Sequence, residues 1–120
     1  MKATVQETFA RIPLHRGGGA VPASAQWPHG EPFAVAFARG SLSVELYAPR
    51  GSDHQTPHTR DELYVVVSGR GELVHGACRD PFGPGDVLFV PAHMEHRFEN
   101  FTDDFATWVV FHGPVGGELP

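Results

Sequence analysis

The sequence predicts an all-β protein, a single small barrel or sandwich of about seven or eight short strands. Glycine (14 residues) and proline (11 residues) make up about a fifth of the 120 residues, which leaves little room for long helices. Between these breakers, short runs rich in β-branched and aromatic residues recur at close and even spacing. The hydrophobic share of 41% is enough for one core, and this length is common for one domain.

The first two predicted strands are Phe33–Arg39 and Ser41–Ala48, with Gly40 between them. The second strand alternates apolar with polar residues, which indicates one buried face. We expect that buried face to carry the apolar residues Leu42, Val44, Leu46 and Ala48.

The remaining predicted strands follow in order between turn-forming residues: Leu63–Ser68, Glu72–Ala77, Val87–Val90, Arg97–Phe101 and Phe105–His112. The strand at 63–68 is nearly all apolar, so we expect both of its faces to be buried. Turns are predicted at 69–71 and at 81–86, where glycine and proline gather. The residues expected in the core or in a pocket wall are Phe37, Leu46, Tyr64, Val66, Phe89, Phe98, Trp108 and Val110.

Residues 1–32 show the weakest pattern of the chain and are expected to form an irregular N-terminal arm. No convincing helix is predicted in it, although Phe9 and Ile12 indicate that parts of it pack. The barrel domain is expected to span residues 33–120, with a loop-like end from Gly113. This divides the chain into 1–32, the arm, and 33–120, the barrel.

The charge distribution excludes several function classes. The nine lysines and arginines are scattered and are outnumbered by 14 acidic residues, so we expect neither nucleic acid nor an anionic membrane as a partner. No run approaches the roughly 18 apolar residues of a membrane helix. With no apolar run before Pro13 and with Cys78 as the single cysteine, we expect a cytoplasmic protein.

Eight histidines in so short a chain are the one oddity of the composition, and two clusters of them carry chemistry. His54, His58 and Glu62 are spaced four and four, so on an extended strand their side chains point to the same side. A second cluster around His96 stands at the head of another predicted strand. Imidazole and carboxylate groups that converge in this way are ligands for a divalent transition metal.

The two clusters resemble the two sequence motifs of the cupin family. His58, Glu62 and Gly69 stand at the spacing of the later part of the first motif. The second motif is matched by Gly85, Pro91, His96 and Asn100. The run from Pro84 to Ala92 is also typical of how the family enters its second motif.

The chain departs from the family pattern at three positions. Thr56 stands where the first motif has its first histidine, and Gly51 lies one residue too close to His58. Either His54, on the same strand parity, or Gln55, through its amide oxygen, can replace the missing ligand, and we prefer His54. His93 replaces a turn glycine, which histidine tolerates better than most residues.

The resemblance implies a cupin-type jelly-roll β-barrel whose interior holds a divalent metal ion on His54, His58, Glu62 and His96. Zinc, iron, nickel, manganese and copper all suit such ligands. It implies a metalloenzyme, dioxygenase- or isomerase-like, acting on a small oxygen-rich organic molecule. The alternative is a cupin that binds or senses a small molecule without catalysis, and catalytic residues beyond the ligands stay unassigned.

The resemblance also implies a homodimer. Exposed edge strands and the apolar residues of the arm favour the same state, because both can be covered by a second copy. The roles of His75 and His93 are left open at this level.

Overall fold

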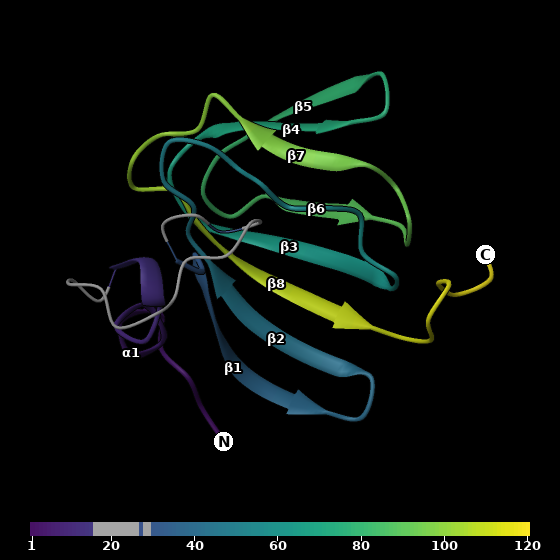
Figure 1. The fold of residues 1–120 in the computed structure, drawn as a ribbon, viewed down its shortest axis with the longest axis horizontal. Helices are drawn as coiled ribbons and strands as arrows, with labels where there is room; N and C mark the ends of the chain where they lie inside the picture. Colours follow the sequence, from purple (N-terminus) through teal and green to yellow (C-terminus); the bar gives the residue numbers. More distant parts are fainter. Residues whose placement is uncertain (16–26, 28–29) are drawn as a thin grey trace.

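The structure is a computed structural model that describes residues 1–15, 27 and 30–120, and it confirms the all-β fold (Figure 1). The strands, in chain order, are β1 (Phe33–Arg39), β2 (Leu42–Tyr47), β3 (Asp61–Ser68), β4 (Gly71–His75), β5 (Cys78–Phe82), β6 (Val87–Val90), β7 (His96–Glu99) and β8 (Ala106–His112). None of the described residues belongs to a helix long and apolar enough to cross a membrane.

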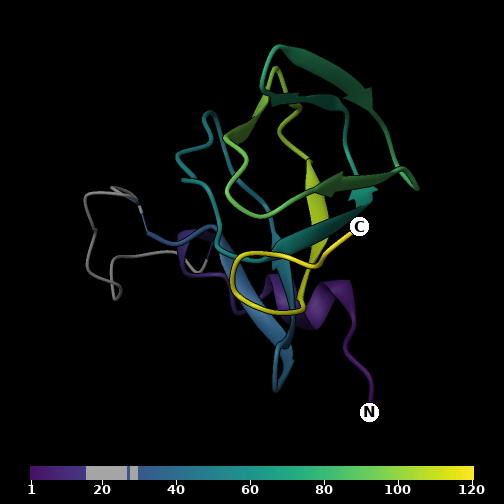
Figure 2. The same cartoon turned by 90° about the vertical axis from the view of Figure 1, so that its right-hand side faces the viewer.

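The strands form two antiparallel sheets that curve around a shared interior, as Figure 2 shows. The larger sheet has the order β1-β2-β8-β3-β6, and the smaller one has the order β5-β4-β7. Phe98 of β7 fills the space between them, with ring centres 5.0 Å from Tyr64 and 4.8 Å from Phe105. This aromatic cluster closes the core and leaves the neighbouring part of the interior to polar side chains.

Alternation along β3 decides which side chains face the interior. Glu62, Tyr64 and Val66 are buried there, at 1%, 1% and 2% exposure. Leu63 and Val65 point to the outer face and are only half-buried, so the expectation that both faces of this strand are buried holds for the inner face alone.

Polar and apolar residues do alternate along β2, but the face that points to the interior is the opposite of the one that the sequence predicted. Glu45 and Tyr47 face the interior, since Glu45 lines the internal cavity and Tyr47 packs in the main core. The apolar face lies on the outside of the sheet, where Leu46 and Ala48 are buried but Leu42 is 43% exposed. The polar face of this strand therefore belongs to the inside of the protein.

The prediction of no helix in the arm was wrong. Val5–Phe9 forms the short helix α1, and Pro13–His15 forms the 3₁₀ helix η1. The Thr4 hydroxyl accepts a hydrogen bond from the Glu7 N–H and caps α1. Five residues are too few to produce a readable helical period, which explains why the sequence pattern missed α1.

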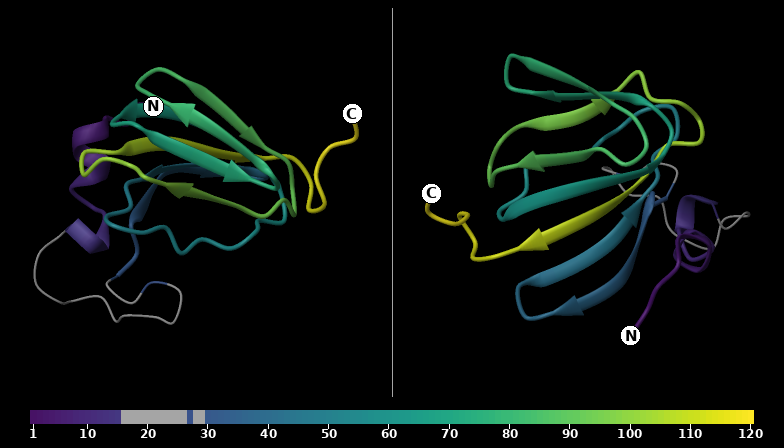
Figure 3. Two further views of the ribbon diagram at one scale, coloured as in Figure 1. Left: turned by 90° about the horizontal axis from the view of Figure 1, so that it is seen from above. Right: turned by 180° about the vertical axis from the view of Figure 1, so that it is seen from behind.

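The helices α1 and η1 pack on the outer face of the larger sheet, beside β1 and β2 (Figures 1 and 3). Ile12, between them, is fully buried against Ala34 and Leu46. The apolar residues of the two helices and of the turn between them are thus covered by this chain's own sheet.

Two further expectations require correction. Strand β5 was missed because its residues are exposed except for Phe82, and because Pro81 lies in it. Proline is compatible with β5 because β5 is an edge strand and can lack a donor. Phe89 of β6 is not a core residue but is 54% exposed on the outer face.

The turn at 91–95 connects β6 to β7 and is held by two backbone donors. The His93 N–H donates to the carbonyl of His58 at 2.7 Å, and the Ala92 N–H donates to the Asp61 carboxylate at 2.9 Å. His93 has a φ of 66°, a left-handed conformation, so it does occupy a turn position that favours glycine. Its structural contribution is this turn, which brings the segment before β3 next to the start of β7.

Candidate metal centre

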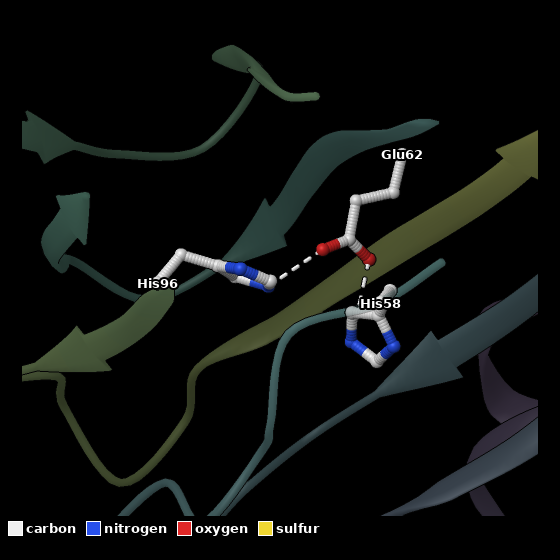
Figure 4. A group of neighbouring side chains, drawn as sticks. All are labelled: His58, Glu62 and His96. Carbon is white, nitrogen blue, oxygen red and sulfur yellow. Dashed lines mark ion pairs between the residues drawn. The ribbon is translucent and has the colours of Figure 1, made fainter. Parts of the chain in front are cut away.

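Three potential metal ligands meet inside the barrel (Figure 4). His58 lies in the segment before β3, Glu62 is the second residue of β3, and His96 is the first residue of β7. One ligand atom of each lies within 4.8 Å of those of the other two. Figure 4 shows the Glu62 carboxylate between the two imidazole rings.

Glu62 is the centre of this group. Its Oε1 lies 2.6 Å from His96 Nε2 and accepts a hydrogen bond of 2.9 Å from the Tyr64 hydroxyl. Its Oε2 is buried without a hydrogen-bond partner and lies 3.7 Å from His58 Nε2. A buried carboxylate oxygen without a partner is costly, and a cation between these ligand atoms would satisfy it. The three side chains therefore fit a divalent metal ion.

His96 presents the correct nitrogen to the group. Its Nδ1 donates to the Met94 carbonyl at 2.8 Å, which leaves Nε2 as the nitrogen that faces Glu62. Burial lowers the pKa of His96, but the hydrogen bond and the charge of Glu62 outweigh this effect, so the pKa lies above its ordinary value. In the metal-free protein, Glu62 therefore favours a proton on the nitrogen that would otherwise bind the metal.

His58 lies at the open side of the group. Burial lowers its pKa, in opposition to the charge of Glu62, so its ring favours the neutral form that a metal needs. Its ring stands edge-on to Phe111 at 5.0 Å, and 32% of its side chain is exposed. Buried Tyr64, whose pKa is raised well above its usual value by burial and then by Glu62, keeps its proton and its bond to Glu62.

The fourth position is reached by Gln55 and not by His54. The Gln55 Oε1 lies 3.0 Å from His96 Nε2 and 3.3 Å from His58 Nε2. His54 is exposed and is hydrogen-bonded to the Ser52 hydroxyl at 2.8 Å, away from the group. The preference for His54 assumed an extended strand, but residues 52–58 are not a strand, and alternation of faces does not apply to them.

Asp53 determines which end of the Gln55 amide faces the group. Its Oδ2 accepts the Gln55 Nε2–H at 2.5 Å and the Phe98 N–H at 2.8 Å. Its Oδ1 accepts the Gln55 N–H at 3.2 Å and also the Tyr47 hydroxyl. Because a carboxylate only accepts, the amide nitrogen of Gln55 must face Asp53 and its oxygen must face the histidines. The sequence analysis missed Asp53, because no motif position falls on it.

The group opens into a cavity of about 350 Å³ over the inner face of the larger sheet. Its described walls contain the aromatic rings of Trp27, Phe33, Tyr47 and Phe111, together with Val109. The polar side chains that reach it include Glu45 of β2, which the sequence analysis placed on the exposed face of its strand. A small molecule in this cavity would touch both the ligand group and the aromatic wall.

The other histidines with open roles lie elsewhere. His75 of β4 pairs with Asp80 of β5 at 2.6 Å on the smaller sheet. His93 is exposed, and only its backbone N–H contributes to the arrangement of the group. His15 of η1 is hydrogen-bonded to the Ala48 carbonyl at 2.7 Å.

Comparison with known proteins agrees with this architecture. A family model described as "Cupin domain" matches residues 43–112. The uncharacterized protein SCO3923 of Streptomyces coelicolor is 40% identical over 76 residues, which cover 62% of this chain and 72% of that protein.

Solved structures give the same result. A cupin 2 conserved barrel domain protein from Salinispora arenicola superposes with a TM-score of 0.57 at 26% identity, covering 68% of this chain and 74% of that chain. A putative mannose-6-phosphate isomerase from Ralstonia eutropha superposes with a TM-score of 0.54 at 28% identity. That match covers 80% of this chain and 95% of the other.

Proposed function

This chain belongs to the cupin family, and we propose that it is a metal-dependent enzyme acting on a small oxygen-rich molecule. In this proposal, a divalent transition metal is held by His58, Glu62 and His96. The amide oxygen of Gln55 is the fourth ligand, in place of His54.

The observation that carries the proposal is the unpartnered Oε2 of Glu62. It is buried, it faces His58 across 3.7 Å, and it borders a cavity large enough for a small molecule. A site that only stabilises a fold is usually closed by four ligands and is often rich in cysteine. Here none of the grouped ligands is a cysteine and one side is open, which favours a site that receives a ligand.

Hydrogen bonds from neighbouring residues fix the orientation of the proposed ligand side chains. Tyr64 fixes Glu62 through its hydroxyl, Met94 fixes the His96 ring, and Asp53 fixes the Gln55 amide. Aromatic side chains form part of the cavity wall. A divalent metal bound there supplies polarisation of a carbonyl or hydroxyl oxygen of the substrate.

Isomerase-like chemistry is the form of the proposal that the comparisons favour. The relative from Ralstonia eutropha, described as a putative mannose-6-phosphate isomerase, covers 80% of this chain at 28% identity. Isomerisation next to a carbonyl needs oxygen polarisation and a proton acceptor, and no redox partner. A metal bound to the ligand group would supply the polarisation, and the proton acceptor stays unassigned.

Elemental analysis of the purified full-length chain tests the metal site. We expect about one transition metal ion per chain in the wild type and in His54→Ala, and clear loss in His58→Ala and His96→Ala. Gln55→Leu is expected to lower occupancy after dialysis against a weak chelator. Circular dichroism of each variant controls for unfolding. Equal metal content in the wild type and His58→Ala would overturn the site.

A second assay tests catalysis. The metal-loaded protein is incubated with aldoses, ketoses and hydroxy acids in deuterated water, and deuterium incorporation next to the carbonyl is followed by NMR. Exchange that needs both the metal and His58 supports an isomerase. Saturable binding without exchange of any of these compounds would instead support a binding or sensing protein.

A further inference from the structure

A second carboxyl faces the cavity from β2, which lies in the same sheet as β3 with β8 between them. Glu45 of β2 pairs with Val109 of β8, and Val109 pairs in turn with Tyr64 of β3. All three line the cavity, so Glu45 and Tyr64 lie on one face of the sheet with one strand between them. Two interstrand spacings separate their backbones, roughly 10 Å.

The Glu45 carboxyl has no partner among the residues that the structure describes. No residue in the described part of the chain donates a hydrogen bond to it or pairs with it. Burial, followed by the charges of Glu62 and Glu31, raises the pKa of Glu45 to about 7. A half-buried carboxyl near other carboxyls is unfavourable for folding, and a bound cation would offset that cost.

The described cavity wall holds no compensating cation. Neither lysine nor arginine is among its described residues. The guanidinium of Arg60 lies 5.8 Å from the ring centre of Phe111, but it donates to the Ser41 carbonyl and does not line the cavity. A positive charge near Glu45 must therefore come from the ligand, as far as the described residues are concerned.

Aromatic rings line the same cavity as Glu45. Trp27 stands edge-on to Phe33 at 6.4 Å and to Tyr47 at 6.2 Å, and all three line the cavity with Glu45. The face of an aromatic ring attracts a cation, most strongly where water is excluded. An unpaired carboxyl beside three aromatic rings is a suitable site for a protonated amine.

We propose that the Glu45 end of the cavity binds the protonated amine of a ligand whose oxygen donors lie at the His58–Glu62–His96 end. The ligand is then a small molecule with an oxygen chelate at one end and an ammonium group several bonds away. This assignment depends on the proposed metal site only for the oxygen end. It disfavours a phosphate group at the Glu45 end, where no described residue of the wall is a lysine or an arginine.

Three hydroxamates that differ only at one end test the proposal. Hydroxamates chelate divalent metals through two oxygens, and the chain of 4-aminobutanohydroxamate ends in an ammonium group. Pentanohydroxamate has a methyl group in its place, and 4-carboxybutanohydroxamate has a carboxylate. Each is titrated by calorimetry at pH 8 into the zinc-loaded full-length chain, as wild type, Glu45→Gln and the control Glu7→Gln, which removes the same charge from exposed α1.

For the wild type and Glu7→Gln, we expect the ammonium probe to bind about tenfold more tightly than the methyl probe, and the carboxylate probe to bind most weakly. In Glu45→Gln, the preference for ammonium over methyl should fall below about twofold, while the methyl probe keeps its affinity. Equal binding of the two probes by the wild type would overturn the proposal. Retention of the preference in Glu45→Gln would do the same.

A metal-free measurement separates this proposal from the metal site. Butylammonium is titrated into the ¹⁵N-labelled metal-free chain, and the two indole N–H resonances are followed. Saturable movement of the Trp27 resonance, with Trp108 as the internal control, is expected in the wild type and not in Glu45→Gln. If zinc does not bind but butylammonium does, the metal proposal fails and the amine site stands. If butylammonium leaves Trp27 unmoved in the wild type, the amine site fails.

Discussion

Replacement of Asp53 by asparagine should damage stability and metal binding together. Each Asp53 oxygen accepts two hydrogen bonds, from the Gln55 N–H and the Tyr47 hydroxyl at Oδ1, and from Gln55 Nε2 and the Phe98 N–H at Oδ2. In Asp53→Asn, an NH₂ group replaces one of these two oxygens, and this NH₂ donor then faces two other hydrogen-bond donors. Whichever way the new amide turns, two hydrogen bonds are lost.

The magnitude follows from the number of donors left unpaired. An unsatisfied buried donor costs about 1–3 kcal/mol, and because Asp53 is only half-buried the lower half of that range applies, giving about 2–4 kcal/mol for two. For a domain of this size, the melting temperature should fall by about 6–15 °C. The Gln55 amide is no longer held with its oxygen toward the histidines, so metal affinity should fall about 10–100-fold.

Thermal melts followed by circular dichroism and competition with a metal chelator measure the two effects. His54→Ala is the control, because His54 is exposed and bonds only to Ser52, and it should change neither quantity. A melting temperature within about 2 °C of the wild type would refute the hydrogen-bond argument for Asp53. A large fall in stability with unchanged metal affinity would refute the role of Gln55 as a positioned ligand.

Three further predictions concern charge, packing and assembly. Since the pKa of Glu45 is raised to about 7, its contribution to the stability of the fold is full below about pH 4.5 and is lost as the pH rises through 7. Glu45→Gln should therefore stabilise the metal-free protein by about 2 kcal/mol at pH 8 and by almost nothing at pH 4. Urea unfolding that shows no such pH dependence would contradict the burial of this carboxyl. Phe98→Ala should cost about 3–5 kcal/mol in the same assay, because Phe98 is 1% exposed and packs on Phe105, whereas a loss below about 1 kcal/mol would show that the core is elsewhere. The homodimer stays a prediction, and the surface to test is edge strand β6, which exposes Val87 and Phe89. Light scattering should give a dimeric mass for the wild type and a monomeric mass for Phe89→Lys. A monomeric wild type would exclude the homodimer.

The fold was predictable because strand alternation and turn residues agree along most of the chain. The elements that were missed are those in which local pattern carries little information. Strand β5 contains Pro81 and exposes most of its side chains, and α1 is held by the Thr4 cap and by packing on the sheet. Such elements depend on tertiary contacts, which the sequence does not display.

The orientation of β2 was harder to predict than its existence. Its apolar face was expected to face the core, but Glu45 and Tyr47 line the interior instead. A barrel that encloses a polar cavity reverses the usual meaning of alternation, because its inside must hold a ligand and its outside can be covered by the arm. A reversed strand is therefore itself an indication of a binding cavity.

In the candidate metal centre, the motif spacing selected His58, Glu62 and His96, which the structure brings together. It failed for the fourth position because the segment that carries His54 and Gln55 is irregular. There, the hydrogen bonds to Asp53 decide which side chain points inward. No local rule of spacing predicts such a bond.

The hydrogen bond from the His93 N–H to the His58 carbonyl makes opening of the site observable. The two ligand segments lie 35 positions apart in the sequence, and this backbone bond joins them whatever the side chain at position 93 is. If the segments separate, the His93 amide is released to water and exchanges its hydrogen, so its exchange rate reports the equilibrium between the assembled and the open site. A ligand that binds only the assembled site must slow that exchange by the factor by which its concentration exceeds its dissociation constant. One amide proton can thus measure affinity for any occupant of the centre, including one that has no colour and undergoes no reaction.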